Sequence, residues 1–219
     1  MNIVYNMDCM EYMRTLPDKA FDLAVVDLPY GIGESGKNNK SRTKLAKAQD
    51  YKPFAGLDKS PPNKECFLEL ARVSKNQIIF GANHFADKLP HPASSCWIVW
   101  DKENGGNDFA DCELAYTSFR TAVRIFRFRW QGMIQGNMKH KENRIHPTQK
   151  PVSLYAWIFN HYAKPGDKIL DTHLGSGSSR IAAYDAGLDF VGCEIDKYYF
   201  KAQEERFAEY TAQCSLFAR

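Results

Sequence analysis

Apolar positions along the chain form two kinds of pattern. The segments FDLAVVD at 21–27 and NQIIFG at 76–81 are almost continuously apolar, as in strands that are covered on both faces of a parallel sheet. The segment NKECFLELARVS at 63–74 instead has apolar residues at helical spacing, which predicts an amphipathic helix. Strands and helices that alternate in this way predict an α/β fold with a doubly wound sheet.

The same patterns place the remaining elements. They predict further strands at 2–6, 95–102, 111–119, 168–171 and 189–196, and further helices at 7–17, 152–163, 178–187 and 197–213. In AVRIFRFRW at 122–130, arginine alternates with apolar residues, which predicts a strand with one apolar and one cationic face. We expect a single domain that spans 1–219.

Composition agrees with one globular core. The chain has 219 residues, of which 44% are hydrophobic and 25% charged, which is enough for one substantial core. The sequence starts without a basic and apolar leader, and no apolar run approaches the roughly 18 residues of a spanning helix. We therefore expect a soluble, cytoplasmic protein with no membrane partner. The six cysteines form no CxxC pair, so the sequence suggests neither a zinc cluster nor a disulfide framework.

Charge is unevenly distributed, although the net charge is only +3. The window 35–64 holds eight Lys/Arg and two acids, and the window 120–144 holds seven Lys/Arg and one acid. Each window is therefore +6, which leaves −9 on the rest of the chain. Two basic surfaces on an acidic body are typical of a protein that binds a polyanion. Ordinary solvated loops are the alternative that charge alone leaves open.

The stretch KILDTHLGSGSSRIAAYDAGLDFVGCEID at 168–196 has the features of a nucleoside site. A strand ends at Asp171, a loop with Gly175 and Gly177 leads into a helix, and the next strand ends at Glu194. Glycines let the backbone approach a ligand closely, and an acid at the second strand end can accept hydrogen bonds from both ribose hydroxyls. The loop lacks the third glycine of the dinucleotide fingerprint and the Lys-Ser/Thr of a P-loop. A ligand with a ribose but no pyrophosphate, such as S-adenosylmethionine, fits better.

Three motifs together carry a specific resemblance: DLPY at 27–30, HPTQKP at 146–151 and DTHLGSGSS at 171–179. With them the sequence resembles the amino-methyltransferases of DNA, and the motif order resembles that of their permuted β group. The resemblance covers nearly the whole chain and is closest to small adenine methylases of phages and prophages. It implies a Rossmann-like class I fold with a mixed seven-stranded sheet and circularly permuted motifs. It also implies that the strand at 2–6 lies in the sheet core beside the cofactor half.

The resemblance implies that S-adenosyl-L-methionine binds at the glycine loop. Four residues would surround the methionine end and the sulfonium: Asp171, Gly175, Ser176 and Gly177. Glu194 would hold the ribose hydroxyls. The hydroxyl of Ser179 is expected only to cap the helix that it opens.

Two other segments would complete the cofactor site. The HPTQKP segment would begin a helix against the methionine end, through Thr148, Lys150 and Pro151. Asp8 and Cys9 match the segment that contacts the adenine of the cofactor, and Asp27 borders the site from the catalytic strand.

The resemblance makes DLPY the catalytic segment. The exocyclic nitrogen of adenine is a poor nucleophile because its lone pair is delocalised, so acceptors must hold its hydrogens while the methyl carbon approaches. Asp27 and the backbone carbonyl of Leu28 would be these acceptors, and Tyr30 would stack on a base flipped from the duplex. Leu28 replaces the usual first proline of the family, but Pro29 still favours an extended backbone before it. Positioning, desolvation and the two acceptors would carry the reaction without a metal or a covalent intermediate.

The two basic windows correspond to two expected DNA contacts. The target-recognition region is expected at about 120–145, and a mobile loop at about 33–60 would close over the flipped base. The DNA-binding residues would be Lys37, Lys40, Arg42 and Lys44 in the loop, and Arg120, Arg124, Arg127, Arg129, Lys139, Lys141 and Arg144 in the recognition region. Their phosphate contacts would make the affinity salt-dependent.

The main prediction is therefore an enzyme that methylates the amino group of adenine in double-stranded DNA. Methylation of the cytosine amino group would use the same mechanism, although family members that do so more often have Ser at the position of Asp27. RNA and protein amide methylases use a similar tetrapeptide but keep the unpermuted motif order. A non-catalytic nucleic-acid-binding module is the alternative from another class, and the intact motifs argue against it. The sequence leaves open a homodimer, a cognate restriction endonuclease and the recognition site.

Overall fold

An eight-stranded sheet forms the centre of the computed structural model, which describes residues 1–33, 58, 60–105, 110–131 and 134–217. The strands of this sheet are β1 (Asn2–Tyr5), β2 (Phe21–Asp27), β3 (Ser74–Phe80), β4 (Trp97–Asp101), β5 (Cys112–Thr117), β6 (Arg124–Arg127), β9 (Lys168–Asp171) and β10 (Asp189–Cys193). Their order is β1-β10-β9-β2-β3-β5-β4-β6. Two short strands, β7 (Trp130–Gln131) and β8 (Ile134–Gln135), form a separate ribbon.

The sheet is mixed, as predicted. Its first five strands, from β1 to β3 in sheet order, are parallel. Strand β5 is antiparallel to β3 and β4, and β6 is parallel to β4. The described sheet has eight strands instead of seven because β6 extends the edge beyond β4. Strand β1 lies beside β10, as expected, but it forms the opposite edge, so its predicted position in the sheet core was wrong.

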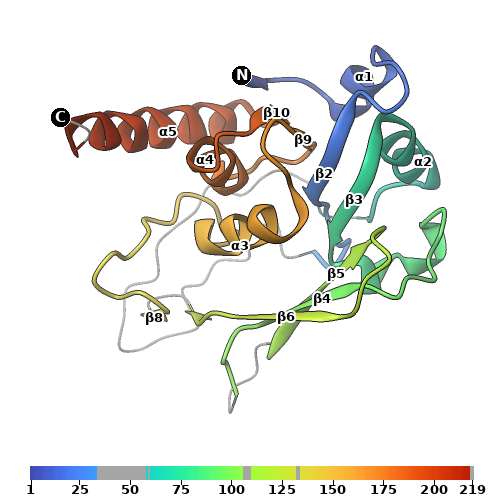
Figure 1. Ribbon diagram of the computed structural model, residues 1–219, viewed down its shortest axis with the longest axis horizontal. Helices are drawn as coiled ribbons and strands as arrows, with labels where there is room; N and C mark the ends of the chain where they lie inside the picture. Colours follow the sequence, from blue (N-terminus) through green and yellow to red (C-terminus); the bar gives the residue numbers. More distant parts are fainter. Residues whose placement is uncertain (34–57, 59, 106–109, 132–133, 218–219) are drawn as a thin grey trace.

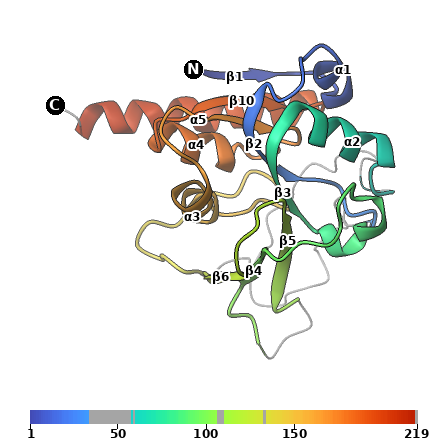
Figure 2. The ribbon, with the colours of Figure 1, turned by 45° about the vertical axis from the view of Figure 1, so that its right-hand side comes forward.

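Helices cover both faces of the sheet, which confirms the α/β class (Figure 1). They are α1 (Cys9–Arg14), α2 (Lys64–Val73), α3 (Val152–Tyr162), α4 (Ser178–Asp185) and α5 (Lys197–Phe217), with short 3₁₀ turns η2 (Ala82–His84) and η3 (Ala86–Lys88) that the sequence patterns did not predict. Helices α1 and α2 lie on one side of the central strands, and α3 and α4 lie on the other (Figure 2).

The continuous apolar run of β2 follows from this arrangement. Leu23 and Val25 belong to the hydrophobic cluster that includes α3, whereas Ala24 and Val26 belong to the cluster that includes α2. Alternate side chains of a strand point to opposite faces, so both faces of β2 are buried. This burial holds the end of β2, at Asp27, in a fixed position.

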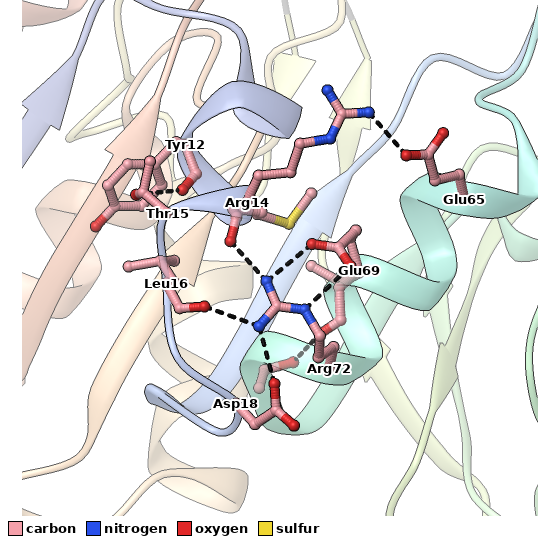
Figure 3. A network of polar contacts seen from close by, with 11 residues as sticks. Tyr12, Arg14, Thr15, Leu16, Asp18, Glu65, Glu69 and Arg72 are labelled. Carbon is pink, nitrogen blue, oxygen red and sulfur yellow. Dashed lines mark hydrogen bonds and ion pairs between the residues drawn. The ribbon is translucent and has the colours of Figure 1, made fainter.

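Arg72 joins α2 to the chain that follows α1 (Figure 3). Its guanidinium donates to the carbonyls of Met13 and Leu16, both at 2.8 Å, and to the carboxylates of Asp18 and Glu69, both at 2.9 Å. The carbonyl groups at a helix end lack hydrogen-bond donors within the helix, and here Arg72 of another helix donates to them. This contact fixes the chain that enters β2.

Strand β6 agrees in part with its prediction. Phe126 packs against Trp157 of α3, with 5.6 Å between ring centroids, and Phe128 packs against the same cluster, while Arg127 and Arg129 are exposed. Ile125 departs from the prediction, because it is 44% exposed on the same face as Arg127. In the part of the chain that the structure describes, no helix is both long and apolar enough to cross a membrane.

Candidate active site

The DLPY segment continues directly from β2. Asp27 is the last residue of the strand and pairs with Phe80 of β3, and Leu28 is buried behind it. Tyr30 stacks on His84, with 5.0 Å between centroids and 16° between planes. A β-carbon on Gly81 would overlap the Tyr30 ring, and Gly81 also has a φ of +67°. Only glycine meets both conditions without strain, so Gly81 defines the place of Tyr30.

Four charged side chains and the Tyr30 hydroxyl surround the end of β2. The Lys150 ammonium lies 2.8 Å from Asp27 Oδ1 and 2.9 Å from Glu113 Oε2. The Tyr30 hydroxyl lies 3.0 Å from Asp27 Oδ1, and Lys102 Nζ lies 2.5 Å from Glu113 Oε1. The cluster thus joins residues of β2 and β5 with the residue before Pro151.

Burial and mutual attraction set the pKa values in this cluster. Burial raises the pKa of Asp27, and Lys150 opposes that rise. Burial alone would also raise the pKa of Glu113, but Lys150 and Lys102 outweigh it and lower the pKa to about 2. Burial would lower the pKa of Lys150, but Asp27 and Glu113 outweigh it and raise the pKa. Lys150 and Glu113 are therefore an ion pair at neutral pH.

Lys150 contacts the DLPY segment. Its ammonium lies beside Asp27 and the Tyr30 hydroxyl, and its predicted contact with the cofactor stays a prediction. Pro151 is the N-cap residue of α3, so the predicted helix start is confirmed. Thr148 is exposed, and its hydroxyl lies 3.1 Å from His146 Nδ1.

The glycine loop lies between the ends of β9 and β10. Gly175 and Gly177 have φ values of +52° and +73°, which favour glycine. The Glu194 carboxylate accepts hydrogen bonds from the amides of Gly175 and Asp196, each at 2.8 Å, and burial raises its pKa. The acid predicted to bind a ribose is therefore fixed against the loop predicted to border it.

Asp171 is buried at the start of this loop. It accepts hydrogen bonds from Ser179 Oγ at 2.5 Å and from the His173 amide at 3.0 Å. Ser179 was expected to cap α4, and this was wrong: the N-cap residue is Gly177, which has no side chain, and the Ser179 hydroxyl turns to Asp171. Ser176, also buried, lies 3.1 Å from the hydroxyl of Ser178.

Titration of Asp171 is expected to appear as a pH dependence of stability. Burial raises its pKa from 3.8 to about 7, so the folded chain binds this proton more tightly than the unfolded chain. The stabilisation is complete below about pH 4 and is lost as the pH rises through 7. In Asp171→Asn this loss of stability should disappear. The difference in unfolding free energy between variant and wild type should therefore change by up to about 4 kcal/mol as the pH rises from 4 to 8. Denaturant unfolding from pH 4 to 8 measures it, and a constant difference would contradict the assignment.

His146 closes one side of the glycine loop. Its ring lies 4.3 Å from the Tyr199 ring, centroid to centroid, and borders the Cα of Gly175. Burial lowers its pKa to about 3, so the ring is neutral at physiological pH. The first residue of HPTQKP thus borders the glycine loop, and Lys150 contacts the end of β2.

The predicted adenine-binding segment has a structural role of its own. Asp8 is the N-cap of α1, where Oδ1 accepts from the amides of Met10 at 2.7 Å and Glu11 at 3.3 Å. Cys9 begins that helix and is a free thiol. The structure leaves the predicted cofactor contact of both residues untested.

The basic residues at 120–144 lie on the surface. All but one of them are exposed: Arg120, Arg124, Arg127, Arg129, Lys139 and Lys141. Arg144 is half-buried and donates to the Pro147 carbonyl at 2.8 Å, while Arg127 lies 3.4 Å from Asp101. Lys37, Lys40, Arg42 and Lys44, with most of the predicted loop at 33–60, lie outside the described residues.

Comparison with known proteins identifies the family. A family model described as a DNA methylase, covering N6 and N4 methyltransferases, matches residues 94–205. YubD of Escherichia coli (strain K12), whose name classes it as a methylase, is 36% identical over 92% of this chain and 88% of its own length. The chain belongs to the DNA methylase family.

Solved structures agree with this DNA methylase fold. The complex of M1.HpyAVI with S-adenosylmethionine matches with a TM-score of 0.59 and 20% identity, over 94% of this chain and 100% of that one. The cytosine-N4-specific PvuII DNA methyltransferase matches with a TM-score of 0.61 and 12% identity, over 94% and 86%. The Rossmann-like class I fold is therefore confirmed. Family membership gives an amino-methyltransferase and does not separate adenine from cytosine.

Glu142 and Arg206 connect β8 and the start of α3 to the glycine loop of this methylase. Glu142 Oε1 accepts from the Val152 amide at 2.9 Å, at the start of α3, and its Oε2 lies 2.9 Å from Arg206. Arg206 also donates to the Ser176 carbonyl at 2.8 Å. The backbone of Glu142 exchanges two hydrogen bonds with Gln135 of β8. Three segments that are far apart in sequence are thus joined through one ion pair.

Sequence patterns did not predict several methylase residues at this site. Glu113 is the sole acid inside the otherwise uncharged strand CELAYT, and an acid in a buried strand is a signal that could have identified it. Gly81 follows the apolar run of β3 and was treated as part of that strand. His84 and Lys102 had no recognisable pattern, because their partners come from other segments of the chain.

Proposed function

We propose that the chain transfers a methyl group from S-adenosylmethionine to the exocyclic amino group of adenine in DNA. The observation that carries the proposal is Asp27 at the carboxyl end of β2, next to β9, whose own end at Asp171 begins the glycine loop. Ligands of parallel α/β sheets bind outside the carboxyl ends of the strands. A methyl acceptor held at Asp27 and a donor held at the loop would meet at that edge.

The residues at the loop fit S-adenosylmethionine. Gly175 exposes its backbone on the side of the neutral His146 ring, where a β-carbon would lie 3.9 Å from that ring. Glu194 directly follows β10, the strand beside β9, and would hold the ribose, while Asp171, Ser176 and Gly177 would border the methionine end. S-adenosylmethionine supplies the methyl group as an electrophile on a positively charged sulfur.

The catalytic segment would hold the amino group of the base. Among the described residues, none donates a hydrogen bond to Asp27 Oδ2, so this oxygen is open to an amino hydrogen, and the Leu28 carbonyl is the proposed second acceptor. As the nitrogen–carbon bond forms, the carbon–sulfur bond breaks and its electron pair stays on sulfur, which becomes a neutral thioether. The nitrogen would then pass one proton by way of the Asp27 carboxylate to water. An ionised carboxylate at this place stabilises the positive charge that develops on the amino group.

Adenine is favoured over cytosine by the aspartate itself. The resemblance associates serine at this position with cytosine enzymes, whereas Asp27 is a largely buried carboxyl group that pairs with Lys150. The exposed arginines and lysines at 120–144 are the proposed DNA contacts, with phosphate contacts that should weaken as salt rises. A homodimer and a cognate endonuclease stay open.

The proposal is tested by incubating the protein with labelled S-adenosylmethionine and unmethylated double-stranded DNA, and then separating the nucleosides. Label in N6-methyl-2′-deoxyadenosine supports it. Label in N4-methyl-2′-deoxycytidine would show that cytosine is the substrate and would leave the proposed mechanism in place. RNA and a protein mixture serve as control acceptors. The absence of label from DNA would overturn the proposal.

Glu194→Ala is expected to weaken S-adenosylmethionine binding by about tenfold to a hundredfold, because hydrogen bonds to a charged group contribute about 1.5–3 kcal/mol. Glu194→Gln should lose less, since one acceptor oxygen remains. Calorimetry measures both affinities, and a DNA-binding assay in low salt should show wild-type affinity. Equal loss of cofactor and DNA binding would point to a folding defect and against the ribose role.

A further inference from the structure

Lys150 is shared between two carboxylates on different strands. Its side chain is 4% exposed, and its ammonium lies 2.8 Å from Asp27 Oδ1, 2.9 Å from Glu113 Oε2 and 3.2 Å from the Tyr30 hydroxyl. An ammonium has three hydrogens to donate, so these three oxygens use all of them. The position of the ammonium is therefore defined from three sides.

The two oxygens of Asp27 are used differently. Oδ1 receives both Lys150 and the Tyr30 hydroxyl, whereas no described residue donates to Oδ2. The proposed reaction needs one carboxylate oxygen for the amino group of the base. The arrangement at Oδ1 leaves such an oxygen available.

Glu113 keeps Lys150 on the Oδ1 side. Its own second oxygen, Oε1, is held by Lys102 at 2.5 Å, and all four charged groups are largely buried. The cluster thus contains two amino groups and two carboxyl groups. Without Glu113, Lys150 would have Asp27 as its only carboxylate partner and could move to bridge both of its oxygens.

We propose that Glu113 is a positioning residue for methyl transfer: it anchors the Lys150 ammonium beside Asp27 Oδ1, so that ionised Asp27 presents Oδ2 to the amino group of the target base. This inference rests on the proposed function of Asp27. It adds a role for two residues that the motif alone does not assign.

The proposal makes opposite predictions for two variants. The titratable groups that face Asp27 are Lys150, Glu113, Tyr30, Tyr155 and Asp171. Without the Glu113 charge, the Lys150 ammonium attracts the Asp27 carboxylate more strongly and lowers its pKa. The acid limb of the pH–rate profile should therefore move to lower pH. Removing the Lys150 charge leaves Asp27 buried beside a like charge, so the limb should move to higher pH.

The experiment measures single-turnover methylation of DNA from pH 5 to 9 in wild type, Glu113→Gln, Glu113→Asp and Lys150→Met. We expect Glu113→Gln to lower the plateau rate by about tenfold to a hundredfold, as for a misplaced catalytic group, with the acid limb at lower pH. Lys150→Met should also lower the rate, with the limb at higher pH. Glu113→Asp keeps the charge but shortens the reach, so its rate should fall while its limb stays near wild type.

Controls separate this role from folding and from the proposed function. Glu69→Gln also removes a carboxylate that pairs with a cation, far from the site in the contact of α1 with α2, and should keep the wild-type rate and limb. If Glu113→Gln does not fold, as judged by thermal unfolding, Glu113→Asp and Lys150→Met decide the matter.

Two results would overturn the inference alone. One is a wild-type rate and pH profile in the Glu113 variants while Asp27→Ala is inactive. The other is a change confined to the KM for S-adenosylmethionine. If wild type transfers no label to adenine, or Asp27→Ala stays active, the proposed function itself has failed.

Discussion

Asp27→Ala is expected to lower the single-turnover rate of methyl transfer by at least about a hundredfold, while binding of S-adenosylmethionine stays close to wild type. The carboxylate is the group that would hold the amino hydrogens and stabilise the charge on nitrogen. Alanine removes both effects and leaves Lys150 paired with Glu113 alone. Asp27→Asn keeps an acceptor oxygen but loses the charge, so it should lie between wild type and alanine.

The matched control for this variant is Asp22→Ala. Asp22 belongs to the same strand and is also paired with a lysine, Lys75 at 2.6 Å, but it lies near the opposite end of β2. It should cost some stability and leave the transfer rate of the folded protein unchanged. Rapid-quench assays with labelled cofactor measure the rates, and calorimetry measures cofactor binding. An active Asp27→Ala would remove Asp27 from the mechanism.

Gly81→Ala is expected to abolish most transfer by moving the Tyr30 ring. The new methyl group would overlap that ring, and the residue would have to keep a φ of +67°. Overpacking costs about 1–3 kcal/mol, and the left-handed backbone adds about 1–2 kcal/mol. Because Tyr30 also contacts Asp27 and Lys150, its displacement should lower the rate by about tenfold or more.

Gly187→Ala separates backbone strain from steric overlap. Gly187 has a φ of +65°, with open space where its β-carbon would lie, so this variant is subject to the backbone strain alone. Thermal unfolding should show a smaller loss for Gly187→Ala than for Gly81→Ala, and transfer should be retained. Equal stability losses and equal rates in the two variants would show that the Tyr30 ring adapts to the added methyl group.

The elements that carry periodic patterns could be predicted from the sequence. Strand β2 has a continuous apolar run because both of its faces are buried, and the glycine loop is marked by the two positive-φ glycines before α4. In both places the signal lies within a few consecutive residues. The family resemblance then supplied the relation between them.

The partners of Asp27 could not be predicted in the same way. Glu113 comes close to Asp27 because Asp27 pairs with Phe80, Phe80 pairs with Ala115, and Glu113 lies two residues before Ala115 on the same face of β5. This requires the order and register of three strands, which no local pattern contains. The same limit explains why the sequence did not predict the pairing of Lys150 with Asp27 and Glu113, and why Ser179 was taken for a helix cap.

The pairing of β1 with β10 has a consequence for how the chain folds. The partners Ile3 and Val191 are joined in one ladder, and Asn6 donates to the Glu194 carbonyl across a separation of 188 residues. Such long-range closure is slow, because its entropy cost precedes its contacts. During synthesis, the first strand must wait for nearly the last one before the cofactor half of the sheet can form. The sheet edge beside Glu194 is thus completed only when β1 and β10 meet.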